Sequence, residues 1–274
     1  MNPAYVIPRV LRHFLPEGLT RFLLLRSLII KPGLETVDPR AAVERYAEVL
    51  AARHDSIGGK RILVFGYGGR FDIGVGLLDA GAKFVALCDR YARPDDAHNR
   101  QLLAAHGDSL YTDGARPLPR SQRMGLIEAD VRHIDPPDVH QRYDLVISNS
   151  VYEHVDDVEG TTHALARWST PDGTHIHFVD LRDHYFKYPF EMLRYPESTW
   201  RRWLNPTSNH NRLRLWDYRR IFEHRFVEVE IEVLQSDPAA FQRIRAHIQP
   251  RFISGSEAEN AVTLIIITAR SPRI

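Results

Sequence analysis

Seven short apolar runs, separated by helix-like stretches, constrain the fold of this chain more than any other feature of its sequence. The runs fall at residues 61–65, 84–88, 126–129, 144–148, 175–181, 226–234 and 262–269. The helix-like stretches fall at 72–80, 96–106, 157–169, 216–224 and 237–247. Nearly continuous apolar strands that alternate with helices indicate a mostly parallel sheet covered on both faces. We therefore predict an α/β doubly wound fold with a seven-strand sheet, in which one of the last two strands runs antiparallel at the sheet edge.

The N-terminal part of the chain has a different pattern. Residues 5–30 carry apolar side chains with interspersed arginines, which suits one or two short helices. Asp38 followed by Pro39 is typical of the start of a further helix. We predict an N-terminal helical cap over residues 1–57 and a single larger domain over 58–274. Arginine-bearing apolar helices are also compatible with weak contact to a membrane surface.

Composition limits the class of protein and its partners. The chain has 274 residues, of which 43% are hydrophobic and 26% charged, as in an ordinary globular protein. Lys plus Arg number 36 against 35 for Asp plus Glu, so the net charge of +1 gives no reason to expect a nucleic-acid partner. The single cysteine, Cys88, cannot form an internal disulfide, and the apolar run 22–30 is too short to span a bilayer. We expect a cytoplasmic protein without a transmembrane segment.

A glycine turn follows the first predicted strand. Gly66, Gly68 and Gly69 lie between that strand and a helix expected to begin at Asp72. Glycines let the backbone turn tightly there, and the free N–H groups of the helix start favour an anionic group. Asp89 ends the second strand, 21 positions after Gly68, where a carboxylate can bind the ribose hydroxyls of a nucleoside. Together these features predict a nucleoside cofactor.

The sequence resembles the class I S-adenosylmethionine-dependent methyltransferases in four segments that occur in the expected order. They are ILVFGYGG, VALCDR, IEADVRHI and YDLVISNSVYEHVDDV, and TPDGTHIHFVDLRDH is similar to the fifth-strand segment of that family. The resemblance covers residues 60–184 and implies S-adenosyl-L-methionine as cofactor. It implies cofactor contacts from Gly66, Tyr67, Gly68, Gly69, Asp89, Arg90, Asp130, Val131, Asn149 and Ser150. In this family the glycine loop contacts the methionine part, Asp89 would hold the ribose, and Asp130 with Val131 would border the adenine.

The chain departs from the family pattern at two positions. Val64 stands where members usually carry an acidic residue, and Arg70 stands where the third loop glycine is usual. These departures leave a non-catalytic cofactor-binding scaffold protein as one alternative. The other is an NAD(P)-dependent oxidoreductase or epimerase on the same architecture, although Phe71 occupies the position of the last glycine of a dinucleotide fingerprint.

Three side chains are candidates for acid–base chemistry at the carboxyl ends of the predicted strands. His154 follows the fourth strand, and Asp183 and His184 follow the fifth, at the sheet edge where ligands bind. Methyl transfer mainly requires the acceptor to be held in line with the methyl group, and a positioned base adds to the rate when the acceptor is a hydroxyl. His154 alternatively caps the following helix.

A metal site is considered and not predicted. His175, His177, Asp180 and His184 carry donor atoms that suit divalent ions. The period-two alternation of a strand places the first two histidines on the opposite face from Asp180. We therefore predict no metal ligands in this chain.

A basic and aromatic stretch follows the fifth strand. Residues 182–225 contain ten Lys and Arg against five acidic residues, and three of the four tryptophans. Aromatic faces stack on rings, and arginine binds phosphate or carboxylate bidentately. We predict that residues 182–215 form a lid over a small polar acceptor, such as a sugar or a natural-product intermediate, that is methylated on oxygen or nitrogen. The alternatives are a basic surface over a packed aromatic cluster, or recognition of RNA bases.

Overall fold

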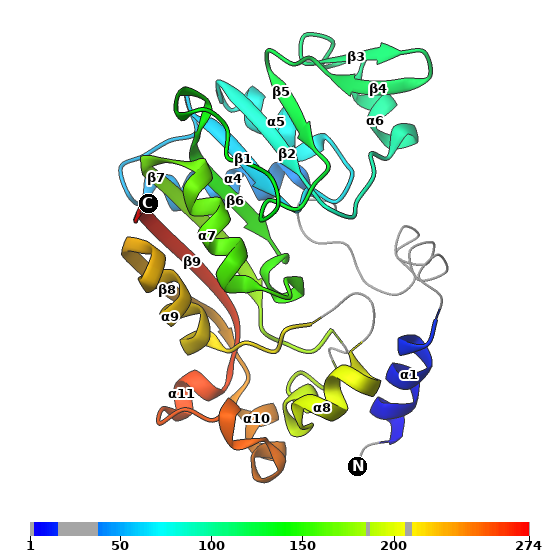
Figure 1. Cartoon of the computed structure of the whole chain (residues 1–274), viewed down its shortest axis with the longest axis vertical. Helices are drawn as coiled ribbons and strands as arrows, with labels where there is room; N and C mark the ends of the chain where they lie inside the picture. The colour runs from blue at the N-terminus through cyan, green and yellow to red at the C-terminus, as the bar shows by residue number, and fades with distance from the viewer. Residues whose placement is uncertain (1–2, 16–37, 185–186, 206–209, 274) are drawn as a thin grey trace.

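The seven predicted strands form one sheet in the computed structural model, which describes residues 3–15, 38–184, 187–205 and 210–273 (Figure 1). They are β1 (Arg61–Phe65), β2 (Phe84–Cys88), β5 (Met124–Ile127), β6 (Tyr143–Asn149), β7 (Ser169–Asp180), β8 (Phe226–Ser236) and β9 (Val262–Pro272). Their order across the sheet is β5-β2-β1-β6-β7-β9-β8. The first five strands in that order pair in parallel, and β9 pairs antiparallel with both β7 and β8. The predicted α/β architecture with a mostly parallel seven-strand sheet is confirmed.

The position of the antiparallel strand differs from the prediction. It is β9, which lies between β7 and β8, and the edge strand β8 runs parallel to β7. β9 is buried along most of its length, whereas Glu228, Glu230 and Glu232 of β8 are all exposed. Charged side chains suit a sheet edge because they oppose pairing with another chain. The more polar of the two strands therefore takes the outer position.

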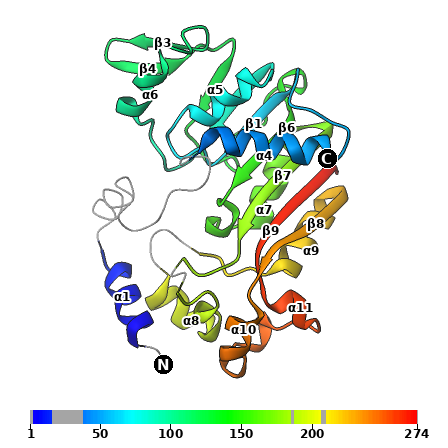
Figure 2. The same ribbon diagram turned by 180° about the vertical axis from the view of Figure 1, so that it is seen from behind.

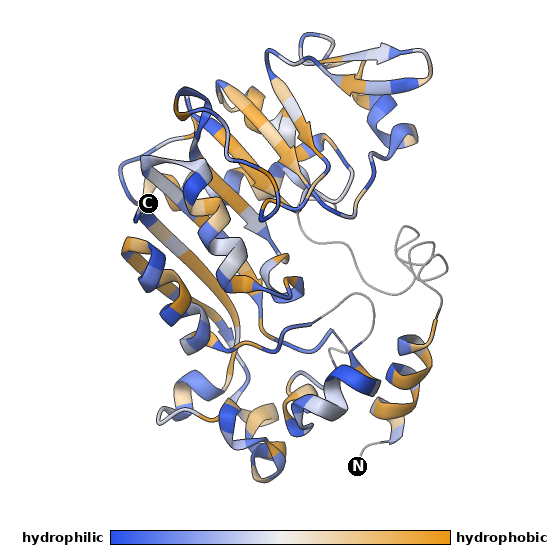
Figure 3. Cartoon of the chain, viewed as in Figure 1, coloured by the Kyte–Doolittle hydropathy of each residue, from blue (hydrophilic) through white to orange (hydrophobic). Residues whose placement is uncertain are grey.

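Helices cover both faces of the sheet. On one face, α4 (Pro39–Ala51) and α5 (Asp72–Asp79) pack through residues such as Tyr46 and Leu77. On the other face, α7 (Val158–Trp168) and α9 (Leu215–Arg225) pack through Leu165 and Phe222. Figure 1 shows α7 and α9 in front of the strands. Figure 2, seen from the opposite side, shows α4 crossing in front of them. Colouring by hydropathy shows that the central strands are largely hydrophobic (Figure 3).

A third hydrophobic core lies beyond the carboxyl ends of β6 and β7. It is built by α1, two segments of the predicted lid and the connection between β8 and β9, with Trp200 and Phe241 fully buried at its centre. Figure 1 shows these helices gathered at one end of the molecule. Its elements are α1 (Pro3–His13), η3 (Glu191–Arg194), α8 (Glu197–Thr199), the π-helical turn η4 (Trp200–Leu204), α10 (Pro238–Ile244), η5 (Arg245–His247), η6 (Pro250–Phe252) and α11 (Glu257–Asn260).

The predicted N-terminal cap divides between two places. Within the described residues, α4 lies on the sheet and α1 packs against η4 in the third core. The start of α4 agrees with the sequence prediction, because the Asp38 carboxylate accepts a hydrogen bond from the Ala41 N–H at 3.0 Å. The part of the predicted cap at 16–37 lies outside the described residues. No helix in the described ranges has the length and apolar character needed to cross a bilayer.

One unpredicted element lies between α6 (Asp96–Leu102) and β5. It is a two-stranded antiparallel hairpin of β3 (Leu110–Asp113) and β4 (Arg116–Pro119). Proline lacks a backbone donor and is confined to edge strands, but each strand of an isolated pair is an edge. Pro117 and Pro119 therefore fit β4, although they make the sequence resemble a loop.

Candidate functional site

The glycine turn between β1 and α5 has backbone angles that glycine adopts most easily. The φ angles of Gly66, Gly68 and Gly69 are +85°, +70° and +92°. A Cβ atom on Gly66 would lie 2.3 Å from Cγ2 of Val151, and one on Gly69 would lie 2.4 Å from the carbonyl oxygen of Arg93. The turn is therefore packed between the segment after β6 and the segment after β2, with no room for a side chain at either glycine.

Asp89 faces this turn from the end of β2. Its Oδ2 accepts a hydrogen bond from the Gly68 N–H at 3.3 Å, and its Oδ1 accepts from the N–H groups of Tyr91 and Ala92 at 2.8 Å each. The side chain is partly exposed, and a carboxylate oxygen can accept more than one bond. Oδ2 is thus directed at the glycine turn and can accept a further bond from a ligand hydroxyl.

Tyr67 contributes a buried hydroxyl to the same turn. The residue is 2% exposed, and its hydroxyl has no hydrogen-bond partner among the described residues. Burial, together with the nearby carboxylate of Asp89, raises the pKa of this hydroxyl, so it stays a neutral donor. Because a buried polar group without a partner costs free energy, the turn is better satisfied with a polar ligand than without one.

Asp130 and Arg90, two further predicted cofactor contacts, bind each other, and Asp130 also binds Arg132. Arg90 donates to Asp130 Oδ2 at 2.8 Å, and Arg132 donates to both carboxylate oxygens, in one case at 2.6 Å. The hydrogen bonds from Arg132, with the charge of Arg90, hold the pKa of Asp130 at about 2. Val131 is buried in the core between the sheet and α7. These contacts fix the loop after β5, and the contact of Asp130 and Val131 with an adenine stays a prediction.

Asn149 and Ser150 lead from β6 into the turn that covers Gly66. Ser150 has φ +56°, and its N–H donates to the carbonyl of Phe178 at 2.9 Å. This bond ties the turn to β7 and directs Val151 onto Gly66. The structure thus brings together the glycine turn, Asp89 and the end of β6, as the sequence predicted, with the Arg90–Asp130 pair beside them.

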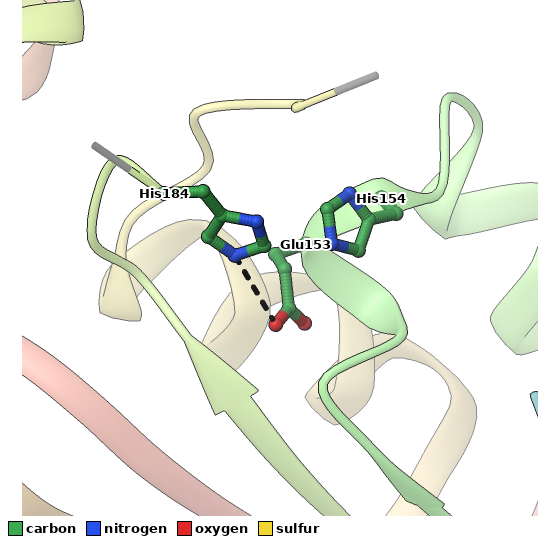
Figure 4. A group of neighbouring side chains, drawn as sticks. All are labelled: Glu153, His154 and His184. Atoms are coloured by element: carbon green, nitrogen blue, oxygen red, sulfur yellow. Dashed lines mark ion pairs between the residues drawn. The ribbon is translucent and has the colours of Figure 1, made fainter. Parts of the chain in front are cut away.

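Three histidines and a glutamate converge beyond the same sheet edge. Glu153 and His154 belong to η2 (Tyr152–His154), His184 follows β7, and His210 precedes α9. Figure 4 shows the first three, whose donor atoms all lie within 4.8 Å of one another. Nε2 of His184 is 4.0 Å from Oε1 of Glu153. The ring of His210 lies 5.1 Å from that of His184 and 5.9 Å from that of His154, measured between centroids.

The buried members of this cluster, Glu153 and His210, lack hydrogen-bond partners among the described residues. Glu153 is 1% exposed and His210 4% exposed, and neither side chain makes a hydrogen bond to any described residue. Burial raises the pKa of Glu153 well above its usual range. The backbone N–H groups of Glu153 and Asp180 lower this pKa only in part, and neither forms a hydrogen bond of normal geometry with the carboxylate. Burial, with His184 and His154 nearby, lowers the pKa of His210. Burial therefore favours the neutral form of both groups, and their lack of hydrogen-bond partners among the described residues is unusual inside a protein.

Asp183, the third predicted catalytic residue, has a different environment. It is fully buried, accepts a hydrogen bond from the hydroxyl of Tyr5 and forms an ion pair with Arg9. Arg9 also donates to the carbonyl of Leu204 at 2.9 Å. Asp183 thus fastens α1 to the end of β7. Because a phenol and a guanidinium already bind its oxygens, it is poorly placed to take a proton from an acceptor.

Two arginines of the predicted lid are structural. Arg212 and Arg214 are fully buried, and burial lowers the pKa of each to about 10. They donate to the backbone carbonyls of Met192, Tyr195, Leu181 and Val262 at 2.6–2.9 Å. Arg212 therefore ties parts of the lid segment to one another, Arg214 joins that segment to the body of the protein, and neither guanidinium is open to a ligand.

His175 and His177 lie inside the protein, apart from the Glu153 cluster. Ser148 Oγ is 2.8 Å from His177 Nδ1, and His177 Nε2 is 3.3 Å from His175 Nδ1. Ser169 Oγ is 2.7 Å from His175 Nε2. Burial lowers the pKa of His175 to about 3, so the ring is neutral. This internal hydrogen-bonded chain excludes both rings from the metal-ligand set that was considered from the sequence.

Sequence reasoning did not single out Glu153 and His210. Glu153 directly precedes His154, so the argument from its place after the fourth predicted strand applies to the glutamate as well as to the histidine. His210 lies in a polar stretch that carries no motif and no periodicity. Only the folded chain brings it to the cluster.

Solved structures share this fold, although no protein-family model matches the chain and no curated protein matches its sequence. The 1,6-didemethyltoxoflavin-N1-methyltransferase of Burkholderia thailandensis aligns with 100% of this chain and 92% of its own, at 14% identity and a TM-score of 0.50. Phosphoethanolamine N-methyltransferase 2 of Haemonchus contortus aligns with 84% of this chain and 53% of its own, at 13% identity and a TM-score of 0.50. The chain has the fold of the class I S-adenosylmethionine-dependent methyltransferases.

The sheet order of this methyltransferase fold also bears on the dinucleotide alternative. In a dinucleotide-binding sheet the sixth strand lies directly beside the fifth. Here the antiparallel β9 stands between β7 and β8, the fifth and sixth strands of the main sheet. The strand order therefore gives no support to a nicotinamide-dependent enzyme.

Proposed function

We propose that this protein transfers a methyl group from S-adenosylmethionine to an oxygen or nitrogen of a small polar metabolite by in-line displacement. The observation that carries the proposal is the carboxylate of Asp89, which faces the glycine turn at the carboxyl edge of a methyltransferase-type sheet. Ligands of open α/β sheets bind at that edge. The relatives of known fold include enzymes that methylate nitrogen on small molecules, which is consistent with this acceptor class.

The residues of the turn fit the cofactor. Asp89 would accept hydrogen bonds from the ribose hydroxyls through Oδ2, and the Tyr67 hydroxyl would gain the partner that it lacks. Asn149 and Ser150 would border the methionine part. When bound, S-adenosylmethionine supplies an electrophilic methyl carbon, which an acceptor atom attacks as the carbon–sulfur bond breaks. The chain's own contribution is to hold the acceptor in line, an effect worth ~7–11 kcal/mol in favourable cases.

The acceptor would lie against Glu153, His154 and His184. Glu153 and His154 follow Ser150 closely in the chain, His184 follows β7, and the three side chains offer polar atoms in a buried or half-buried setting beyond the sheet edge. His154 or His184 would take the proton that a hydroxyl or ammonium acceptor loses, which adds a factor of ~10²–10⁴ when the base is well placed. Residues 182–215 would cover the acceptor as a lid. We infer that a small polar acceptor, such as a sugar or a natural-product intermediate, suits this largely buried polar group better than a macromolecule does.

Isothermal titration calorimetry with S-adenosylmethionine tests the cofactor site. The variant Asp89→Asn keeps the shape of the side chain and removes its charge. It should raise Kd by about 10–100-fold, since a hydrogen bond to a charged group contributes ~1.5–3 kcal/mol. The matched control is Asp108→Asn, at an exposed position remote from the glycine turn in sequence, and should bind as the wild type does. Unchanged affinity in Asp89→Asn, or tighter binding of a dinucleotide, would contradict the assignment.

Transfer of a labelled methyl group tests the reaction. The protein is incubated with methyl-labelled S-adenosylmethionine and a metabolite extract, and the labelled products are separated by size. Label in the small-molecule fraction is the expected result. Label confined to protein or RNA would overturn the acceptor class, and cofactor binding without transfer would favour the scaffold alternative.

A further inference from the structure

Four side chains at the carboxyl ends of β6 and β7 carry metal-binding donors. Glu153, His154, His184 and His210 offer a carboxylate oxygen or an imidazole nitrogen, which zinc and similar divalent ions prefer in proteins. The donor atoms of the first three lie within 4.8 Å of one another (Figure 4). A tetrahedral zinc ion with bonds of ~2.0–2.1 Å has ligand atoms about 3.3 Å apart. Side-chain rotations that bring these three donors closer by up to about 1.5 Å would therefore give three ligands of such a site and leave its fourth position open.

The backbone that carries these side chains is already fixed. The side chain of Asn211 donates to the carbonyls of Tyr152 and Val155 at 2.7 and 3.0 Å, and its own N–H donates to the carbonyl of Glu153 at 3.0 Å. These bonds hold His210 against η2. On the other side, the ion pair of Asp183 with α1 fixes the segment that carries His184. Preorganised ligands reduce the ordering cost of binding.

The unsatisfied polar atoms of the cluster point to a cation. The buried carboxylate of Glu153 has no hydrogen-bond partner among the described residues, and neither ring nitrogen of His210 has one. The neighbouring carboxylate of Asp180 is already bound bidentately by Arg182, at 2.9 and 2.6 Å. The charge of Arg182 lowers the pKa of Glu153 in part, but the Glu153 carboxylate accepts no hydrogen bond from it. A divalent ion would supply the missing partners and would favour the ionised form of Glu153.

We propose that Glu153, His154 and His184 bind one divalent transition-metal ion of the zinc type, with His210 beside them and the fourth position left open. This site revises the sequence-based prediction of no metal ligands, which considered His175 and His177 and left Glu153 out. With an ion bound, His154 and His184 serve as ligands, and the ion polarises the acceptor atom in place of an imidazole base. That consequence rests on the proposed methyl transfer, whereas the binding of the ion does not.

Metal titrations of the full chain test the site. The protein is freed of any affinity tag, stripped with a chelator and titrated with ZnCl₂ in a calorimeter, without S-adenosylmethionine. We expect one equivalent of zinc per chain. CoCl₂ should give the intense visible bands of a tetrahedral site, and zinc should displace it. Absence of a stoichiometric ion would overturn the proposal.

Two variants and a control locate the ion. Glu153→Gln removes the charge with little change of shape, and His184→Ala removes one imidazole. Each should weaken zinc binding by at least ~100-fold, because loss of a direct ligand exceeds the 10–100-fold effect of losing an outer partner. His247→Ala removes an exposed histidine outside the cluster and should bind zinc as the wild type does. Wild-type affinity in both cluster variants would contradict the assignment.

Melting temperatures of the metal-free proteins separate a metal ligand from a structural residue. Because the Glu153 carboxylate is buried without a partner, metal-free Glu153→Gln should melt at the wild-type temperature or above it. Zinc should raise the melting temperature of the wild type and not that of the variant. A lower melting temperature in metal-free Glu153→Gln would overturn the proposal. Since no cofactor is present, failure of this test leaves the methyl-transfer proposal intact, and the reverse also holds.

Discussion

Replacing Gly66 with alanine should destabilise the protein for two separable reasons. Its φ of +85° costs an L-residue ~1–2 kcal/mol. The new Cβ would also lie 2.3 Å from Cγ2 of Val151, and overpacking of this kind costs ~1–3 kcal/mol. Gly66→Ala should therefore lower the free energy of unfolding by about 2–5 kcal/mol.

A double-mutant cycle with Val151→Ala separates the two contributions. Val151→Ala removes both γ-carbons and leaves the Cβ, which would be 3.1 Å from the new methyl group. In Gly66→Ala/Val151→Ala the strain of the positive φ remains and most of the clash is gone. The double variant should thus be about 1–3 kcal/mol more stable than the sum of the single effects predicts.

Urea unfolding followed by circular dichroism measures all of these free energies. Gly59→Ala is the matched control, because Gly59 has φ +74° and an added Cβ would meet nothing within 4 Å. It should lose only the ~1–2 kcal/mol of backbone strain. Additive effects in the cycle, or a Gly66→Ala variant no less stable than Gly59→Ala, would refute the argument that the turn is pressed against Val151.

Two further predictions concern buried charge. The free energy of unfolding should fall as the pH drops from about 6.5 towards 3, because His175 stays neutral in the folded protein while its unfolded form takes up a proton. His175→Gln should reduce the pH dependence of that free energy by up to ~1.4 kcal/mol per pH unit. Urea unfolding across this pH range measures the change. Arg9→Met should destabilise the protein by about 3–5 kcal/mol, because it leaves the buried carboxylate of Asp183 without its cation. Thermal unfolding should show partial recovery in Arg9→Met/Asp183→Asn, and an unrecovered double variant would count against this pairing.

Most of the fold was predictable because its signals are local. Each strand appears in the sequence as a short apolar run. Gly68 and Asp89 belong to one strand–helix–strand unit, so their spacing along the chain predicts that the Asp89 carboxylate lies at the glycine turn. The alternating glutamates of β8 are also a local signal, because they are typical of a strand at the edge of a sheet. The β3–β4 hairpin was not, since its prolines are typical of a loop.

The candidate acceptor site was only half predictable because its contacts are long-range. Arg9 and Asp183 are 174 positions apart, and no local pattern pairs them. His210 reaches Glu153 through the side chain and N–H of Asn211, which hydrogen-bond to the backbone of η2. His154 and His184 could be predicted because each follows a strand in the sequence. The approach of His210 to them depends on tertiary packing.

A crystal structure of the chain with S-adenosylhomocysteine tests the central claim most directly. The expected result is an adenosyl group at the glycine turn, with ribose hydroxyls donating to Oδ2 of Asp89 and the hydroxyl of Tyr67 bonded to the ligand. A ligand bound elsewhere, or a carboxylate of Asp89 turned away from the ribose, would contradict the proposed function.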